Sequence, residues 1–294
     1  MKKVLFSILA LVMLTTAVNA QSVIDANDGR NPNDFYQKGI VVGKKPMPYP
    51  FLRESDVVWS TTIWRNIDMN ETFNQFMYFP KDTAKSAQGR INLVHLILRS
   101  AANGDFEVYE DDDMKVPQEW AKAYEAVCNE NQSQIETGEV DEDDNPVYET
   151  VKTIGDPDFE TFTKVKLKEY WYIDKQDTRQ KVRIVGLCFF FDKTTYQAGS
   201  EVVLNNQESF WVPMDDLRVR KALVNANAYV ESNDVAERSY DDIFVQRFFD
   251  SYVTRESNVH NRSITDYLTG VDAIYESQMI EEKIFDIESD MWEY

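Results

Sequence analysis

The clearest pattern of hydrophobic and polar positions is a period-two alternation across residues 164–191. Successive side chains of a strand point to opposite faces, so the alternation predicts a strand with lysines on one face and apolar side chains on the other. Residues 174–180 predict a turn, after which a second strand returns with the same alternation and runs into an apolar end. The basic face of this predicted hairpin consists of Lys164, Lys166, Lys168, Lys181 and Arg183.

Helical spacing dominates the segments before the hairpin. Residues 56–80 place apolar side chains at mixed helical spacing and contain Trp59 and Trp64. These tryptophans and their neighbours are predicted to belong to a folded core or a permanent interface rather than to a ligand pocket. Residues 91–102 predict a helix that ends at an Asn-Gly pair, and residues 117–128 predict another with proline in its first turn.

The last third of the chain predicts a short strand followed by helices. Residues 209–212 have the composition of a strand, and residues 215–223 predict a helix that one of two aspartates opens. Ser239 and Asp242 have the spacing of a capping box, and the predicted helix after them carries a wide apolar stripe as far as Tyr252.

Residues 266–292 predict a long closing helix, because apolar side chains recur there at helical spacing. No sequence period of 20–50 residues is present, which excludes a solenoid. The elements predict an α+β fold, in which an antiparallel sheet with a long basic hairpin is flanked by several helices and preceded by an extended N-terminal arm. We expect residues 54–294 to form a single α+β domain with acidic loops at residues 105–144.

The N-terminal segment predicts export from the cytoplasm. Residues 1–20 contain two early lysines, an apolar run and a small-residue cleavage pattern, which is typical of a secretory signal peptide. The apolar run is shorter than the about 20 residues that a transmembrane helix needs, so no direct membrane insertion is expected. Residues 21–53 contain four prolines and no clean apolar period, which predicts an extended arm. A disordered leader and an arm that docks on a neighbouring chain both stay open.

The charge of the chain argues against some partners. The 294 residues carry a formal net charge of −20, so binding to nucleic acid would lack its electrostatic term and no nucleic acid partner is expected. Residues 105–144 hold fifteen acidic residues and two lysines, and the acidic runs at residues 110–113 and 141–144 are expected to be solvated loops. A calcium loop that begins at Asp141 is excluded, because proline and lysine stand where glycine and glutamate are needed.

The predicted hairpin is a basic island in this acidic chain. Residues 164–183 contain seven basic and three acidic residues. One interpretation is a docking face for an acidic surface on another subunit, with residues 105–144 of an adjacent copy as the nearest candidate. The other interpretation is that the hairpin lies opposite the acidic loops of its own chain, and the sequence does not decide between them.

Little in the sequence points to catalysis. His95 and His260 are the only histidines, which leaves almost no material for a His-based triad or a two-His metal site. No phosphate-binding, dinucleotide-binding or nucleophile-elbow motif occurs. We therefore expect no catalytic, cofactor-binding or metal-binding residues, although abundant carboxylates keep a two-carboxylate hydrolase in view. Cys128 and Cys188 could form a disulfide or remain two buried thiols.

Three blocks of the sequence carry distinctive motifs. They are residues 56–80 (DVVWSTTIWRNIDMNETFNQFMYFP), residues 166–191 (KLKEYWYIDKQDTRQKVRIVGLCFFF) and residues 210–262, which contain RESNVHNR. These blocks resemble the GldN family, also called PorN. The resemblance covers most of the chain after the predicted signal peptide and is weakest in residues 105–144.

The resemblance implies a non-enzymatic periplasmic subunit of the type IX secretion and gliding machinery. The partners it implies are the outer-membrane lipoprotein GldK (PorK), the periplasmic region of the motor protein GldM (PorM), and neighbouring copies of the protein in a ring. The location it implies is the periplasm, peripherally at the outer membrane through the lipoprotein. The alternative from a different class is a periplasmic carboxylate-based hydrolase or ligand-binding protein that uses the acidic clusters.

Overall fold

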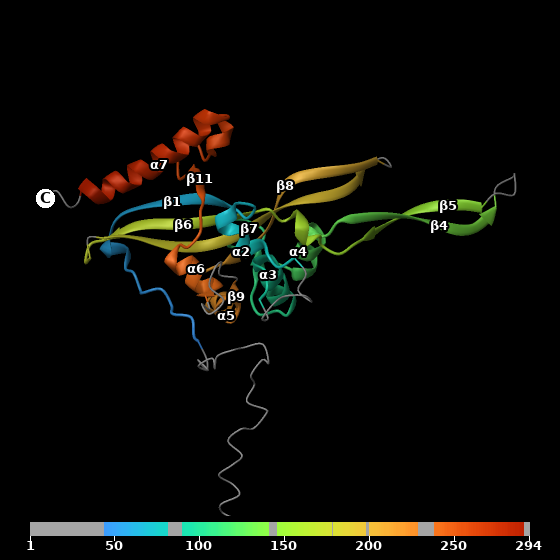
Figure 1. Ribbon diagram of the computed structural model, residues 1–294, viewed down its shortest axis with the longest axis horizontal. Coiled ribbons are helices and arrows are strands. Elements are labelled where there is room, and N and C mark those ends of the chain that lie inside the picture. Colours follow the sequence, from blue (N-terminus) through green and yellow to red (C-terminus); the bar gives the residue numbers. More distant parts are fainter. Residues whose placement is uncertain are drawn as a thin grey trace, which may run out of the picture. The chain divides into compact units, whose positions relative to one another are not determined.

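The predicted hairpin forms the centre of the main sheet (Figure 1). Its strands are β6 (Lys164–Asp174) and β7 (Gln180–Gln197), and they pair antiparallel over most of the length of β6. All strand pairs of the sheet are antiparallel, in the order β11-β1-β6-β7-β8-β2-β3. The other strands are β1 (Val57–Asp68), β8 (Ser200–Pro213), β11 (Tyr252–Glu256), β2 (Val108–Tyr109) and β3 (Pro117–Gln118).

The computed structural model describes residues 44–81, 90–140, 146–177, 179–197, 200–228 and 238–290. These residues combine helices with the antiparallel sheet, so the predicted α+β fold class is confirmed. The predicted signal peptide at residues 1–20 and most of the predicted arm lie outside the described residues. The proposed boundary between the arm and the domain therefore stays a prediction.

The prediction of helical structure across residues 56–80 was wrong for its first half. Residues 57–68 form β1, which lies between β6 and the edge strand β11. The β-branched and tryptophan side chains of this segment suit a pleated surface, and pairing on both sides outweighs its irregular apolar spacing. Only the following residues are helical, in a 3₁₀ turn (Thr72–Asn74) and the short helix α2 (Gln75–Tyr78).

The remaining helices agree broadly with the predictions. Asn92 caps α3, since its side chain accepts a hydrogen bond from the backbone N–H of His95 at 2.7 Å. Ser239 and Asp242 form the predicted capping box of α6, with both reciprocal hydrogen bonds present. The helices are α3 (Leu93–Ala102), α4 (Trp120–Val127), α5 (Leu217–Val224), α6 (Tyr240–Gln246) and α7 (Val271–Asp290).

Three helices are shorter than predicted. The closing helix α7 begins only at Val271, because residues 264–266 form a separate 3₁₀ turn and residues 267–270 are not helical. Residues 117–118 form the edge strand β3, so α4 begins only at Trp120. The helix α6 ends at Gln246 because Arg247 adopts a left-handed backbone conformation, with φ of 54°. The chain then turns back, and Tyr252 begins β11 instead of continuing the helix.

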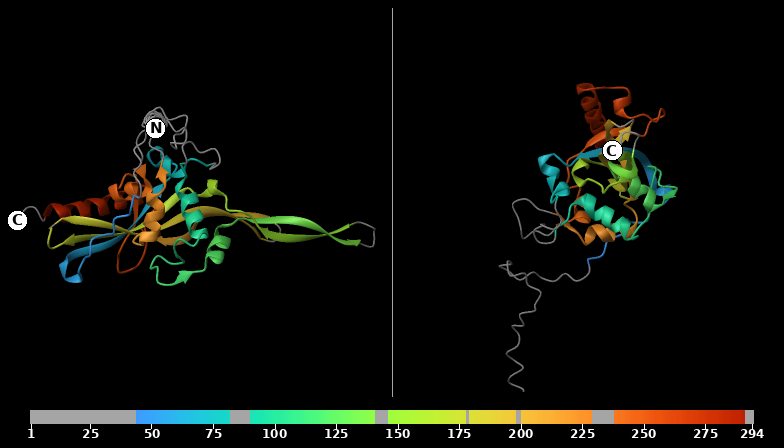
Figure 2. Two further views of the ribbon diagram at one scale, coloured as in Figure 1. Left: turned by 90° about the horizontal axis from the view of Figure 1, so that it is seen from below. Right: turned by 90° about the vertical axis from the view of Figure 1, so that its right-hand side faces the viewer.

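The hydrophobic core lies mainly between the sheet and the helices α3, α5 and α6, which Figure 2 shows lying across the strands. Val165 and Leu167 of β6 are fully buried in this core. Trp171 is on the same face of β6 and packs against a second cluster, which includes Ile63 and the α7 residue Ile280. One face of the central strand therefore supports both the main core and the C-terminal helix.

The acidic region contains more regular structure than expected. Residues 110–113 form a loop, as predicted, but residues 130–140 belong to β4 (Glu130–Val140). This strand pairs antiparallel with β5 (Pro146–Ile154) in a separate two-stranded sheet. The second acidic run, residues 141–144, lies outside the described residues.

The end of the predicted arm is held by its own chain. Arg220 of α5 donates a hydrogen bond to the carbonyl oxygen of Met47, and Arg183 of β7 donates one to the carbonyl oxygen of Pro50. The ring of Tyr49 lies 5.0 Å from the Arg220 guanidinium and 5.4 Å from that of Arg183. An arm that orders only on a neighbouring chain was therefore a wrong expectation for residues 47–50.

Candidate functional site

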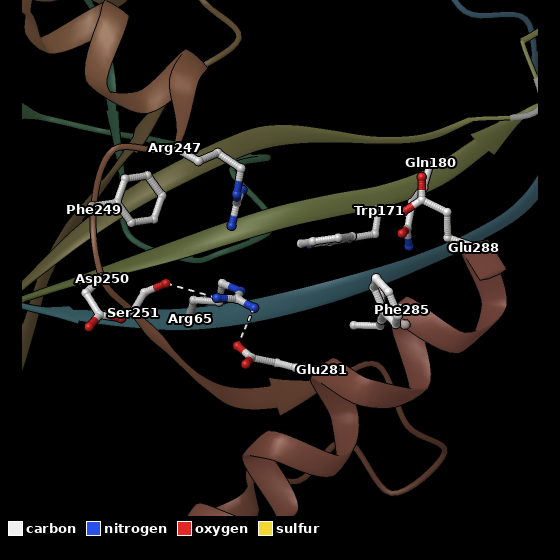
Figure 3. Close-up of a pocket in the computed structure, with 11 residues that line it drawn as sticks. Arg65, Trp171, Gln180, Arg247, Phe249, Asp250, Ser251, Glu281, Phe285 and Glu288 are labelled. Atoms are coloured by element: carbon white, nitrogen blue, oxygen red, sulfur yellow. Dashed lines mark hydrogen bonds and ion pairs between the residues drawn. The ribbon is translucent and has the colours of Figure 1, made fainter.

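A pocket of about 490 Å³ opens between the main sheet, the turn after α6 and the helix α7 (Figure 3). Its wall combines charged and aromatic side chains from four different elements. Those that matter most for its chemistry are Arg65, Trp171, Arg247, Phe249, Glu281 and Phe285.

A buried carboxylate lies beneath this wall. Glu169 of β6 is fully buried, and its two oxygens accept hydrogen bonds from Arg247 at 2.7 and 3.3 Å. The indole N–H of Trp171 donates a third hydrogen bond at 2.9 Å, and the Nε of Arg65 lies 3.6 Å away. A buried charge needs this many partners, because an unpaired carboxylate in the interior would be strongly unfavourable.

Arg65 extends the network to the C-terminal helix. Its Nη1 donates to the Ser251 hydroxyl at 3.0 Å, and its Nη2 donates to Glu281 of α7 at 2.5 Å, as the dashed lines of Figure 3 show. The guanidinium groups of Arg65 and Arg247 lie 5.9 and 5.3 Å from the ring centroid of Trp171, within cation–π range. We call Arg65, Glu169, Trp171, Arg247 and Glu281 the arginine clamp.

The arginine clamp is better suited to holding segments together than to catalysis. Both oxygens of Glu169 are occupied by donors, and Glu281 is paired with Arg65. Two further carboxylates, Asp250 and Glu288, line the pocket. Paired carboxylates of glycosidases lie about 5–9.5 Å apart and face one another across the substrate, whereas Glu281 is bound to Arg65.

A second charged cluster lies on the opposite face of the sheet. Trp64 is buried, and its indole N–H donates to the Asp112 carboxylate at 3.0 Å. The guanidinium of Arg255 lies 3.6 Å from the Trp64 ring centroid, and Lys168 donates to the Asp112 carbonyl oxygen at 2.7 Å. The prediction that Trp64 belongs to the folded core is confirmed, whereas Trp59 is only half-buried.

The register of the hairpin spreads the predicted basic face along the strands. Lys168 pairs with Gly186, but the register slips at the next residue, so Glu169 pairs with Ile184. Lys181 and Arg183 lie opposite Tyr172 and Tyr170, which continue the lysine face of β6. The five cations therefore share one face, but Lys181 and Arg183 lie beside tyrosines rather than beside the lysines of the first strand.

The hairpin cations meet acidic groups of the same chain. Lys166 lies 2.6 Å from Glu208, and Lys168 lies 3.5 Å from Asp113 in the acidic loop. Lys181 pairs with Asp177 and Asp174, and its hydrogen bond to Asp177 is the main cause of its raised pKa. The structure favours the interpretation in which the hairpin cations pair with acidic groups of their own chain.

The histidine and cysteine side chains are placed as structural groups. His95 is half-buried on α3, and desolvation followed by the charge of Arg99 lowers its pKa. Cys128 and Cys188 are both buried and free, so no disulfide joins them. Burial raises the pKa of Cys188 to about 12, which keeps it a thiol at neutral pH. Within the described part of the chain, no three His, Cys, Asp or Glu side chains converge to hold a metal ion.

The residues of the arginine clamp were not singled out by the sequence. Their one signal is Glu169, which falls on the otherwise apolar face of the predicted strand beside Leu167 and Trp171. A carboxylate at such a position indicates a buried partner. The partners themselves, Arg65 and Arg247, are too far away in sequence for any spacing to reveal them.

Comparison with models of known protein families identifies one family that matches most of the chain. The family described as "Gliding motility associated protein GldN" matches residues 52–293. The chain belongs to the GldN family. This GldN-family protein is therefore a component of the gliding-motility and type IX secretion machinery. No curated protein matches the chain. None of the helices in the described residues is both long and apolar enough to cross a membrane.

Proposed function

We propose that this GldN-family protein is a non-enzymatic structural subunit of the type IX secretion and gliding machinery. It acts in the periplasm, where the lipoprotein GldK (PorK) holds it at the outer membrane and forms a ring with it. It contacts the periplasmic region of the motor protein GldM (PorM). Neighbouring copies of the protein meet in the same ring.

The arginine clamp is the observation that carries the structural role. It ties β1, β6 and the turn after α6 to one buried carboxylate, at Glu169, and Arg65 links this network to α7 through the partly exposed Glu281. Removal of one member of a buried ion pair typically costs 3–5 kcal/mol, because the other charge is left without a partner. Such a connection resists the separation of the turn after α6 from the sheet, which suits a subunit that bears load.

The alternative is a periplasmic carboxylate-based hydrolase or ligand-binding protein. The pocket beside α7 is the place where it would act. One of its carboxylates argues against hydrolysis, since Glu281 is engaged by Arg65 and is not free to act on a substrate. A structural subunit therefore accounts better for the chemistry of this wall.

Co-expression with the lipoprotein partner tests the proposal. The chain without residues 1–20 should move with the lipoprotein into a very large particle in sedimentation and in size-exclusion chromatography. A matched sample without the lipoprotein provides the reference size. If the two proteins migrate separately at the sizes of the free chains, the proposed assembly is wrong.

A further inference from the structure

The helix α7 has apolar side chains on two faces, but only one face packs against the rest of the protein in the described residues. The inner face places Ile280 and Ile284 in the cluster beneath the helix. On the outer face, five large apolar side chains are each between 60% and 68% exposed. At 3.6 residues per turn these five share an arc of about 140°. They are Val271, Ile274, Tyr275, Met279 and Phe285, here called the outer stripe; Phe285 lies at its edge and also borders the pocket described above.

The outer stripe has the character of an interaction surface. Single exposed apolar side chains are common on soluble proteins, but a row of them along one helix is typical of a contact site. A helix that is apolar on two opposite faces is expected to be covered on both.

The rim of the outer stripe is acidic. The helix α7 carries seven acidic residues and one lysine. That lysine, Lys283, pairs with Glu256 of β11 at 2.9 Å, so its charge is directed toward the sheet. Glu282 and Asp286 fall within the arc of the outer stripe and are exposed. A matching partner would combine apolar side chains with positive charge.

The chain itself contains such a segment. Residues 38–45 read KGIVVGKK, in which three lysines surround an apolar Ile-Val-Val run. No acidic residue occurs between Asp34 and Glu54, in a chain whose formal net charge is −20. We propose that the outer stripe of α7 binds residues 38–45 of a second copy of this protein.

The path of the chain favours a second copy over the same one. Hydrogen bonds from Arg220 and Arg183 fix residues 47–50 against α5 and β7. Figures 1 and 2 show residues 44–50 leaving on the side of β1 and β6 away from α7. Because the chain leaves the folded unit on the side away from its own α7, we assign the outer stripe to a second copy.

This inference rests on the proposed function in one respect, namely that copies of the protein meet. Two kinds of interaction would stabilise the contact itself. Burial of the outer stripe supplies affinity, and the lysines opposite the acidic rim supply orientation and speed of association. High salt should weaken the second interaction more than the first.

Self-association of the chain from residue 21 onward, measured by analytical ultracentrifugation, tests the contact. The double variant Ile274→Glu with Met279→Glu should weaken association by roughly tenfold or more, which corresponds to about 1.4 kcal/mol or more. Val259→Glu is the matched control, since Val259 is 99% exposed outside α7, and it should associate like wild type. Equal association of the double variant and wild type would overturn the proposal.

Charge reversal makes the test specific to the two segments. Lys44→Glu with Lys45→Glu should weaken association, and so should Glu282→Lys with Asp286→Lys. The four changes together should restore association toward wild type, because the opposite charges again face each other. Failure of the combined variant to recover, after each pair alone has weakened association, would show that these charges do not meet.

A cysteine pair distinguishes the second copy from the same chain. Copies with Val41→Cys are mixed under oxidising conditions with copies with Met279→Cys, and a disulfide-linked dimer is expected; wild type with its two buried thiols is the background control. If the two changes placed in one chain form only a link within that chain, the proposed second copy is wrong.

Association with the lipoprotein partner is measured in parallel on the same variants. If the proposed function is wrong, the wild-type protein will not associate with the lipoprotein. Failure of the present inference would appear as an intact lipoprotein complex whose copies associate equally well with and without the outer stripe.

Discussion

The carboxylate of Glu169 accepts two hydrogen bonds from the guanidinium of Arg247, across 78 residues of sequence. The backbone of Arg247 is left-handed, a conformation that costs a non-glycine residue about 1–3 kcal/mol. The same residue therefore ends α6 and supplies the main partner of a buried charge. The ion pair offsets the backbone cost at a position where glycine would otherwise be the favoured residue.

Replacement of Glu169 by glutamine should destabilise the fold by about 3–5 kcal/mol, because two arginines lose their shared counter-charge in the interior. The measurement is the free energy of unfolding in urea. Glu208→Gln is the control, since Glu208 pairs with Lys166 at a partly exposed position and should cost no more than about 1 kcal/mol. Equal costs for the two variants would show that the arginine clamp contributes little.

Trp64→Ala should cost about 3–5 kcal/mol, because it removes a buried ring and leaves Asp112 without its indole donor. Trp59→Ala should cost distinctly less, since Trp59 is only half-buried on the same strand. Thermal unfolding of the two variants side by side is the measurement. A smaller effect at position 64 than at position 59 would contradict the placement of Trp64 in the core.

Lys164 and Lys168 of β6 should contribute differently to the free energy of unfolding. Lys168→Ala should reduce the free energy of unfolding by about 1–3 kcal/mol, because Lys168 is buried and donates to Asp112. Lys164→Ala should stay within about 0.5 kcal/mol of wild type. If Lys168→Ala instead left stability unchanged and weakened subunit association, the hairpin would be a docking face after all.

Cys188 should be unreactive in the native protein. Its pKa of about 12 means that the thiolate is scarce below that pH, and its burial blocks access. Iodoacetamide at pH 8 should leave position 188 unmodified in the folded chain and label it in urea, as read by mass spectrometry. Because the folded pKa lies above the ordinary value of 9.0, the stabilising contribution of the protonated thiol is present below pH 9 and is lost as pH rises toward 12.

Deletion of residues 21–45 should weaken assembly and leave the unfolding midpoint unchanged. The deletion retains Tyr49 and its contacts with Arg183 and Arg220, which belong to the folded unit. Tyr49→Ala in the full chain is the comparison, and its expected cost is about 0.5–2 kcal/mol from the lost cation–π contacts. If the chain that lacks residues 21–45 assembles as well as the full chain, these residues have no role in assembly.

Sequence patterns could predict the hairpin because β6 alternates cleanly between lysines and apolar side chains. They could not predict β1, since Ile63, Trp64 and Arg65 are all buried in succession. Different groups cover the two faces of β1, namely the cluster under α7 and the cluster around Trp211, so no polar face marks the strand.

The arginine clamp was beyond sequence reasoning for a different reason. A glutamate on an apolar strand face indicates that a cation contacts it in the interior. It does not indicate which lysine or arginine supplies that contact. The chain contains 31 lysines and arginines, and the two that contact Glu169 come from β1 and from the turn after α6. Only the sheet order, with β1 beside β6 and β11 beside β1, brings them together.

That sheet order also sets when the fold can be completed during synthesis. Strand β1 is among the first parts of the folded unit to be made, yet one of its neighbours is β11, and Arg65 meets a helix residue 216 positions later. Chains are made from the N-terminus, and contacts between distant residues form slowly because a long loop must close first. A nascent chain that stops before residue 252 leaves one edge of β1 open and Arg65 without Glu281. Completion of the native structure therefore waits for the last 43 residues of the polypeptide, 252–294, and most of the chain is translated before β1 can gain its second neighbour.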